Sequence, residues 1–261
     1  MLDEMAKRGG VMSRLLSKTE IQSRYEQPGW KRMVFAELEA TLESKSRPFP
    51  CVFGVSGFKT DQLRFAFLDR LSADAVAPLL QEYLANARSF GRMTSLVLFA
   101  RPGPVLGIEA YRQQFWSLLD DLEALDPTPR PSGVSERVND ASWEFCFAGE
   151  PIFVVCNTPA HVLRQSRRST SFMVTFQPRW VFEGITDTDD PAMQRALLKV
   201  REHLSNFDAV SPAPFLGKYG DPENREYQQY FIDDSNRVPG CPFHELGKAR
   251  DKHETGKGKV A

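Results

Sequence analysis

Four cysteines and four histidines are the residues of this chain best suited to metal binding or nucleophilic chemistry. Cys51 follows a proline, lies between Phe49 and Phe53, and is followed three residues later by Gly54. Apolar walls shield a sulfur atom and a glycine lets backbone N–H groups approach it, which are features that tune a thiolate metal ligand. A free cysteine also packs as a small hydrophobic residue, so both roles are open for Cys51.

A second arrangement places Cys156 at the end of an apolar segment, directly before a predicted short helix that begins at Thr158-Pro159 and carries His161. The positive end of a helix dipole lowers the pKa of a thiol, so Cys156 would suit a nucleophile assisted by His161. The alternative is a buried cysteine at a strand end beside a hydrogen-bonded core histidine.

The remaining thiols and imidazoles carry weaker signals. The chain has no CxxC pair, no CxxCH, no HExxH, no GxSxG and no nucleotide-binding glycine motif. Cys146 is expected to pack in a strand, and His203 is expected to be solvated on an amphipathic helix. Cys241 precedes Pro242-Phe243-His244 near the end of the chain and is a weaker candidate ligand.

The composition is that of an ordinary globular protein. Of 261 residues, 41% are hydrophobic and 26% charged, and the formal net charge of −1 does not favour nucleic acid or an anionic membrane as a partner. No apolar run approaches the roughly 20 residues of a membrane span, and the acidic N-terminus is unlike a signal peptide. We therefore expect a cytoplasmic protein with reduced thiols.

Hydrophobic periodicity predicts interleaved helices and strands. Helices are predicted over about 19–43 with an interruption at Gly29, over 73–89 and over 191–207, and a further one over 108–125. Ser72 is the expected N-cap of the second helix and Gly91 its stop signal. Strands are predicted over 94–100 and 171–176, and a β-hairpin over 143–156.

Two shorter segments complete the prediction. Residues 49–54 are expected to form a buried strand or extended segment, and the stripe Leu63, Phe67 and Leu71 predicts a helix after Gly57. The fold class is α+β, a single domain with a small antiparallel or mixed sheet flanked by helices. We expect an N-terminal helical extension over 1–46, a core domain over 47–245 and a disordered tail over 246–261.

Six strings along the chain resemble the YqcI/YcgG family. They are FPCVFG (49–54), EFCFAGEPIFVVCNTPAH (144–161), RQSRRS (164–169), FQPRWVFEG (176–184), GDPENREYQQYF (220–231) and CPFHE (241–245). The likeness spans roughly residues 47–245. Some members of this family are haem-dependent N-hydroxylases of arginine-like guanidino or amino groups. The resemblance therefore implies non-covalent haem b, dioxygen, a small nitrogen-bearing substrate and an electron-donor protein.

With haem implied, Cys51 is the first candidate for the axial ligand and the metal-binding residue. A thiolate opposite dioxygen favours cleavage of the O–O bond, which a hydroxylation requires. Phe49 and Phe53 would pack on the porphyrin. The other candidate ligands are Cys156, His161 and Cys241, and His161 would alternatively donate a hydrogen bond to bound dioxygen.

Charged side chains are candidates for binding the carboxylates of the cofactor and the charged groups of the substrate. Guanidinium groups pair with carboxylates, so the candidates for binding haem propionates or an amino-acid carboxylate are Arg164, Arg167, Arg168 and Arg179. The candidates for binding a cationic substrate are Glu150, Asp221 and Glu223. The alternatives are a solvated basic helix face for the arginines and ordinary turn chemistry for the acids.

The leading prediction is a haem-dependent monooxygenase that N-hydroxylates an arginine-like metabolite. One alternative is a non-catalytic haem or small-ligand binding protein, such as a sensor or carrier. Another is a thiol-based enzyme that uses Cys156 and His161. The sequence fixes neither the substrate, nor the redox partner, nor the oligomeric state.

Overall fold

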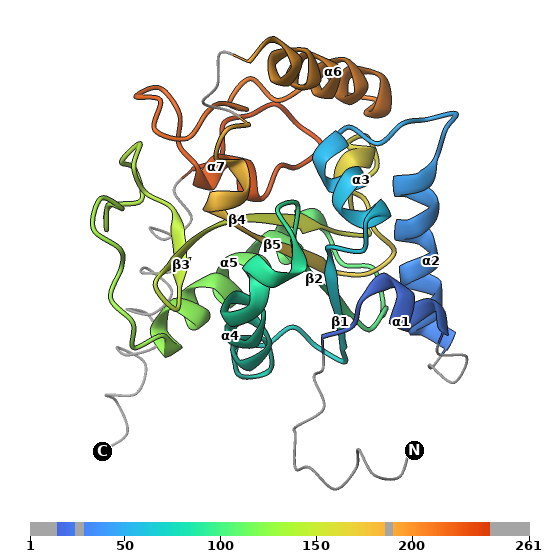
Figure 1. Ribbon diagram of the computed structural model, residues 1–261, viewed down its shortest axis with the longest axis horizontal. Coiled ribbons are helices and arrows are strands. Elements are labelled where there is room, and N and C mark those ends of the chain that lie inside the picture. Colours follow the sequence, from blue (N-terminus) through green and yellow to red (C-terminus); the bar gives the residue numbers. More distant parts are fainter. Residues whose placement is uncertain (1–14, 24–28, 186–189, 241–261) are drawn as a thin grey trace, which may run out of the picture.

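A five-stranded mixed sheet forms the centre of the fold in the computed structural model, which describes residues 15–23, 29–185 and 190–240 (Figure 1). The strands are β1 (Arg64–Leu68), β2 (Leu96–Ala100), β3 (Phe145–Phe147), β4 (Glu150–Asn157) and β5 (Met173–Pro178). Their order across the sheet is β1-β2-β5-β4-β3. β1 and β2 are parallel and all other neighbours are antiparallel, so the prediction of an α+β domain with a small mixed sheet is confirmed.

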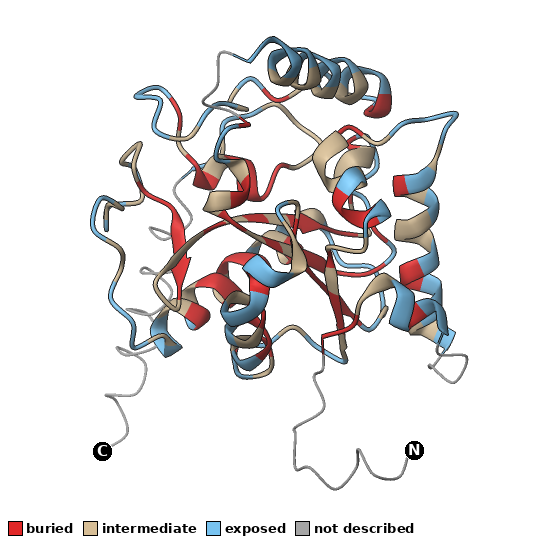
Figure 2. Cartoon of the chain, in the orientation of Figure 1, coloured by how far each residue is buried: buried red, intermediate tan, exposed pale blue. Residues whose placement is uncertain are grey.

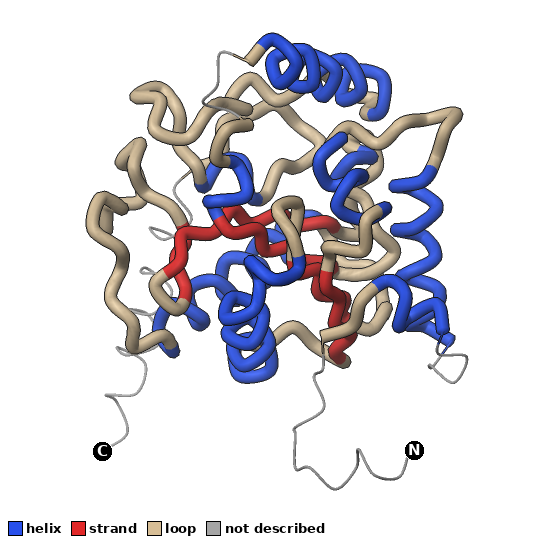
Figure 3. Tube along the Cα trace, viewed as in Figure 1, coloured by secondary structure: helices blue, strands red, loops and turns tan. Residues whose placement is uncertain are grey.

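Helices surround this sheet (Figure 3). They are α1 (Lys18–Ser23), α2 (Gly29–Glu43), α3 (Val52–Lys59), α4 (Ala73–Phe90), α5 (Ile108–Leu125), α6 (Pro191–Phe207) and α7 (Tyr227–Tyr230), with the 3₁₀ turns η2 (Gln165–Arg167) and η3 (Arg179–Phe182). α4 and α5 pack on one face of the sheet, whereas α2 and α3 cover the other face near β1 and β2. No helix in the described ranges is long and apolar enough to cross a membrane.

Side chains alternate between the two faces of the sheet, as the pleat of a strand requires. On β4, Ile152, Val154 and Cys156 enter the core formed with α4 and α5. The residues between them point to the opposite face, and β5 alternates in the same way. The buried residues in Figure 2 are accordingly concentrated on the strands and on the inward sides of α4 and α5.

Several predicted elements are confirmed. α5 covers 108–125 as predicted, and α4 begins after Ser72 and ends at Gly91, whose φ of 127° favours glycine. The β3–β4 hairpin turns at Ala148 and Gly149, which have φ of 51° and 77°. Positive φ at both turn residues matches the right-handed twist of the flanking strands.

Three predicted elements are wrong. Residues 49–54 are not a strand, because α3 begins at Val52 with Cys51 as its N-cap. The helix predicted after Gly57 is replaced there by the end of α3 and by β1. Residues four apart, such as Leu63 and Phe67, lie on one face of a helix and also on one face of a strand. The spacing in this short segment therefore fitted either structure.

The helix predicted from Thr158 is the third error. Thr158 forms an isolated bridge with Arg168, and the intervening chain contains only the 3₁₀ turn η2. Cys156 therefore has no helix N-terminus beside it. Cys241 and the predicted tail over 246–261 lie outside the described residues.

The close approach of Gly57 to the segment before β2 gives a stability test of how α3 is seated. A Cβ atom at Gly57 would lie 2.2 Å from the carbonyl oxygen of Met93. We expect Gly57→Ala to lower the free energy of unfolding by about 1–3 kcal/mol, because the backbone must shift to relieve the clash. Urea unfolding measures this change.

The matched control is Gly103→Ala, since no heavy atom lies within 4 Å of the added Cβ there. Its effect should stay within about 0.5 kcal/mol. Equal unfolding midpoints for the two variants would contradict this account of α3.

Candidate functional site

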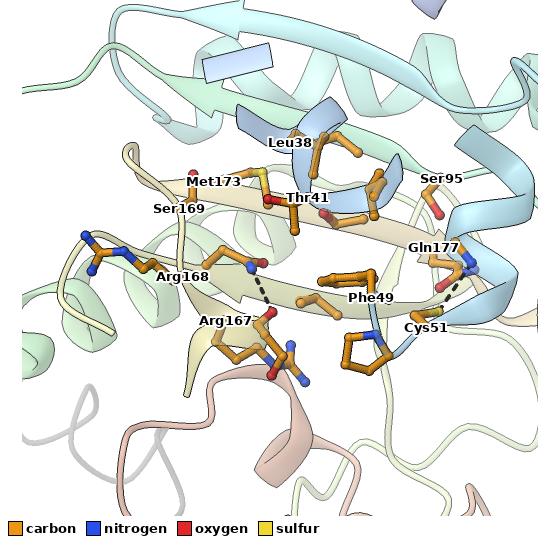
Figure 4. Close-up of a pocket in the computed structure, with 18 of the residues that line it drawn as sticks. Leu38, Thr41, Phe49, Cys51, Ser95, Arg167, Arg168, Ser169, Met173 and Gln177 are labelled. Atoms are coloured by element: carbon orange, nitrogen blue, oxygen red, sulfur yellow. Dashed lines mark hydrogen bonds between the residues drawn. The ribbon is translucent and has the colours of Figure 1, made fainter. Parts of the chain in front are cut away.

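A cavity of about 290 Å³ lies on the face of the sheet opposite α4 and α5 (Figure 4). Its floor is formed by alternate residues of two strands, Phe153, Val155 and Asn157 of β4 and Met173, Thr175 and Gln177 of β5. Its cover comes from α2, the segment 49–51, residues 164–169 and α6. Most of the wall is apolar, and the size is near the lower end of ligand pockets, which are about 300–1,000 Å³.

Cys51 is the described cysteine that lines this cavity. It is the N-cap of α3, and its Sγ accepts a hydrogen bond from the Gly54 backbone N–H at 3.3 Å. Phe49 lines the cavity beside it and packs edge-on against Phe207 at 5.5 Å between ring centroids. Phe53 is not among the lining residues, so only one of the two predicted aromatic walls faces the cavity.

The charge state of Cys51 reflects opposing effects. Burial raises the pKa of the thiol, whereas the backbone N–H groups of Gly54 and Phe53 and the charge of Arg167 lower it. Burial is the larger effect, so the sulfur is a protonated thiol when no cation is bound. A metal centre supplies the charge that deprotonates a coordinating thiol, and the N–H groups then stabilise the thiolate.

Two members of the predicted arginine cluster are already committed to protein groups. Arg164 is buried and pairs with Asp208 at 3.7 Å, while its Nε donates to the carbonyl of Asp233 at 2.7 Å. Arg168 is exposed and donates to the carbonyl of His161 at 2.9 Å. Both reach the cavity wall, but their donors fix the loop around them.

Arg167 differs from its neighbours. Its Nη2 donates to the carbonyl of Gln229 at 3.2 Å, whereas the buried Nη1 has no hydrogen-bond partner among the described residues. Burial lowers the pKa of Arg167 to about 10, and the nearby Arg164 adds to this effect. The guanidinium therefore stays charged at neutral pH while facing the cavity.

Sequence reasoning missed the polar residues of the cavity that lie on α2 and on the strands. Glu37 is the carboxylate that lines the cavity within the described ranges, and its Oε2 accepts from the N–H of Thr170 at 2.9 Å and from its hydroxyl at 2.6 Å. Thr41 lies one helical turn further along α2. The four-residue spacing of Glu37 and Thr41 beside Leu38 was a visible signal that this face of α2 is not wholly apolar.

Other polar groups of the cavity wall come from the strands and the segment before β2. Ser95, Thr175 and Gln177 line the cavity, and Ser95 and Gln177 are labelled in Figure 4. The described residues hold no group of three or more His, Cys, Asp or Glu side chains placed to bind a bare metal ion.

Cys156 and His161 do not line the cavity. Cys156 is fully buried on the α4 and α5 side of the sheet, where burial raises its pKa well above the ordinary value. The Nε2 of His161 lies 2.9 Å from the carbonyl of Ile232, so it must donate, and Nδ1 then accepts from the Thr158 hydroxyl at 2.9 Å. Both ring nitrogens are thus occupied, as the structural alternative for His161 expected.

The remaining predicted site residues also lie away from the cavity. Arg179 makes a two-point ion pair with the buried Glu144 and pairs with Glu226 as well. Asp221 and Glu223 are exposed and form a turn in which the Asp221 carboxylate accepts from the Glu223 N–H at 2.9 Å. Glu150 is partly buried in the hairpin and is likewise not a lining residue.

Comparison with known proteins gives a consistent family match. Residues 38–244 match the sequence model of the YqcI/YcgG family. Bacillus subtilis (strain 168) has two similar proteins, both described as uncharacterized. YqcI is 41% identical over 246 residues (90% of this chain, 96% of YqcI), and YcgG is 41% identical over 230 residues (85% of this chain, 90% of YcgG).

A more distant relative carries a functional name. DcsA of Streptomyces lavendulae is 28% identical over 246 residues, covering 90% of this chain and 91% of DcsA. Its name, given provisionally, is N(omega)-hydroxy-L-arginine synthase. No solved structure matches the chain significantly.

The buried imidazole of His161 gives a pH-dependence test. Burial lowers its pKa from 6.5 to about 4, so the unfolded chain takes up a proton at a pH where the folded protein does not. This contribution to stability is complete above pH 6.5 and is lost as the pH falls towards 4. Between pH 7 and pH 5 the loss should be about 2 kcal/mol.

Urea unfolding of wild type and His161→Gln at both pH values isolates this contribution from that of the carboxylates. The variant should be the less stable protein at pH 7, and its deficit should shrink by about 2 kcal/mol at pH 5. A deficit for His161→Gln that does not change with pH would contradict the buried neutral imidazole.

Proposed function

Because the chain belongs to the YqcI/YcgG family, we propose that it N-hydroxylates the guanidino or amino group of a small arginine-like metabolite. We further propose that it uses haem b bound in the cavity at Cys51. The name of DcsA supports N-hydroxylation as the reaction class. The observation that carries the assignment of the site is the Cys51 thiol, held by a backbone N–H and open to an apolar cavity.

The kinds of side chain on the cavity wall support the proposal of such a cofactor. Haem requires an apolar slot, an axial ligand and cationic groups for its propionates. The wall supplies Phe49, Phe153 and Met173 as apolar surface and Cys51 as a thiol ligand. It also supplies Arg167, a partly buried cation whose buried Nη1 has no partner among the described residues. The chemistry supplied by a bound haem is activation of dioxygen, which thiolate ligation favours.

The protein's own residues then have distinct tasks. The Gly54 and Phe53 N–H groups stabilise negative charge on the Cys51 sulfur. The apolar walls exclude water, and Glu37 accepts hydrogen bonds from a cationic substrate nitrogen. In the overall reaction one oxygen atom of O₂ forms the N–O bond and the other leaves as water. An external donor, for which we propose an electron-transfer protein, supplies two electrons and two protons enter from solvent.

The alternative roles are less well supported by the described structure. A thiol enzyme based on Cys156 and His161 would need a nucleophile that substrate can reach, whereas Cys156 is fully buried and both His161 nitrogens are engaged. A non-catalytic haem or small-ligand carrier would use the same cavity. Turnover distinguishes that carrier from an enzyme.

The cofactor is tested by the visible spectrum of protein produced with a haem precursor. We expect a Soret band, and a reduced CO adduct at the position typical of thiolate ligation, because Cys51 is the thiol at the cavity. Cys51→Ala should lose the thiolate signature. Cys146→Ala, a change at a buried cysteine away from the cavity, should retain it.

A spectrum unchanged in Cys51→Ala would exclude this residue as the ligand. Absence of any Soret band in the wild-type protein would exclude haem altogether.

Substrate turnover is tested with L-arginine, dioxygen and a reductant, with the oxygenated product detected by mass spectrometry. Glu37→Gln removes the charge that attracts the substrate cation, so we expect KM to rise by about 10- to 100-fold. Glu39→Gln, on the same helix but outside the cavity lining, is the control.

The spectrum of Glu37→Gln should match that of the wild type, since the carboxylate is not a ligand. An unchanged KM in Glu37→Gln would rule out Glu37 as the group that binds the cation. Absence of product from any guanidino compound would favour the carrier.

A further inference from the structure

We propose that Arg167 forms a carboxylate-binding site in the cavity wall, which takes either a propionate of the cofactor or the α-carboxylate of an amino-acid substrate. This inference deepens the proposed function and rests on it for the identity of the acid. It assigns carboxylate binding to Arg167, one of the four arginines that the sequence indicated as candidates.

The contacts of the three clustered arginines separate their roles. Arg164 pairs with Asp208 and donates hydrogen bonds to the carbonyl of Asp233 and to the side chain of Asn236, the last at 2.8 Å. Arg168 is exposed and donates to main-chain carbonyls. Arg167 alone of the three combines a place on the cavity wall with a buried nitrogen, Nη1, that has no partner in the described part of the chain.

A buried, unsatisfied donor on a charged group is unfavourable, and such groups in folded proteins are usually satisfied by a protein group, a water molecule or a ligand. No carboxylate among the described residues forms an ion pair with Arg167. Asp208, whose charge acts on Arg167, is held by Arg164 and accepts from both the N–H and the hydroxyl of Ser166, at 2.7 and 2.8 Å. Arg164 therefore takes the ion pair with Asp208, and Nη1 of Arg167 has no partner among the described residues.

The backbone holds Arg167 in place before any ligand arrives. Its carbonyl accepts from the Thr158 N–H at 3.0 Å, and the carbonyl of Ser166 accepts from the side-chain amide of Asn157 at 3.2 Å (Figure 4). These bonds fix the backbone, and the bond from Nη2 to the Gln229 carbonyl restrains the guanidinium, so the side chain loses less conformational freedom on binding. Arg167 is also close enough to Cys51 for its charge to lower the pKa of the thiol, so the anion site and the thiol share one cavity.

A carboxylate is the ligand that this geometry favours. It is planar, carries one negative charge, and accepts from a guanidinium through charge-assisted hydrogen bonds. Nη2 donates to the Gln229 carbonyl, and the buried Nη1 is a donor that an incoming oxygen atom would satisfy. Both a haem propionate and an amino acid present this group, and the two sources are distinguished by experiment.

The first measurement uses the wild-type full-length protein without haem, and follows thermal stabilisation and absorbance. One pair of probes is haem and its dimethyl ester, and the other is L-arginine and agmatine, which lacks the carboxylate. We expect the acid of at least one pair to bind about 10- to 100-fold more tightly than its neutral analogue. Equal affinities within both pairs, or no binding in either, would overturn the proposal without any variant.

The second measurement assigns the site to Arg167. Arg167→Gln should remove the preference for the acid in the pair that shows it, while the ester or agmatine binds as before. Arg167→Lys, which keeps a charge and serves if the glutamine variant fails to fold, should retain part of the preference. Arg168→Gln, a change at the exposed neighbour, should leave the preference intact.

A preference that survives in Arg167→Gln would place the site elsewhere and overturn the assignment. If neither the wild-type protein nor the variants bind haem, the proposal of a haem cofactor is wrong. The comparison of L-arginine with agmatine still tests the role of Arg167. The failure of the anion site and the failure of the haem proposal are therefore distinguishable.

Discussion

The alternation of side chains along β4 and β5 is the constraint on which the cavity depends. Every second residue of these strands must pack against α4 and α5, so the residues between them are left to form the floor of a ligand space on the other face. α2, the residues before α3, and α6 cannot close tightly over that floor, and the volume between them remains. A shift of one residue in register would exchange the two sets of side chains.

Buried charge is the second organising feature, and most of it is neutralised within the protein. Arg164 is matched with Asp208, and Arg179 with Glu144 and Glu226. Burial raises the pKa of Glu144 to about 7 in spite of Arg179, which shows how strongly desolvation acts in this interior. These pairs fix the loops between β4 and α7, because breaking one would leave a charge buried without a partner.

The thiol at the cavity illustrates how the same forces prepare a residue for chemistry. Desolvation favours the neutral form of Cys51, while two backbone N–H groups and Arg167 favour the thiolate. A buried thiol balanced in this way is a weak nucleophile by itself, and the proposed cofactor would supply the positive charge that favours its thiolate form. Cys156 lacks those N–H groups and lies on the opposite face of the sheet. Desolvation raises its pKa, and the charge of Arg167 opposes this effect.

The fold class, the long helices α4, α5 and α6, and the β3–β4 hairpin could be predicted from the sequence, because caps, turns and periodicity are local signals. The motifs that relate the chain to its family could also be read there. Short segments such as 49–54 and 63–71 were misassigned, since their apolar spacing fits more than one period. The three-dimensional arrangement was needed to show that Cys51 rather than Cys156 faces the cavity and that Glu37 lines it from α2. It was also needed to show that Nη1 of Arg167 has no partner among the described residues. These depend on which face of the sheet each residue occupies and on partners distant in the chain, which no local pattern encodes.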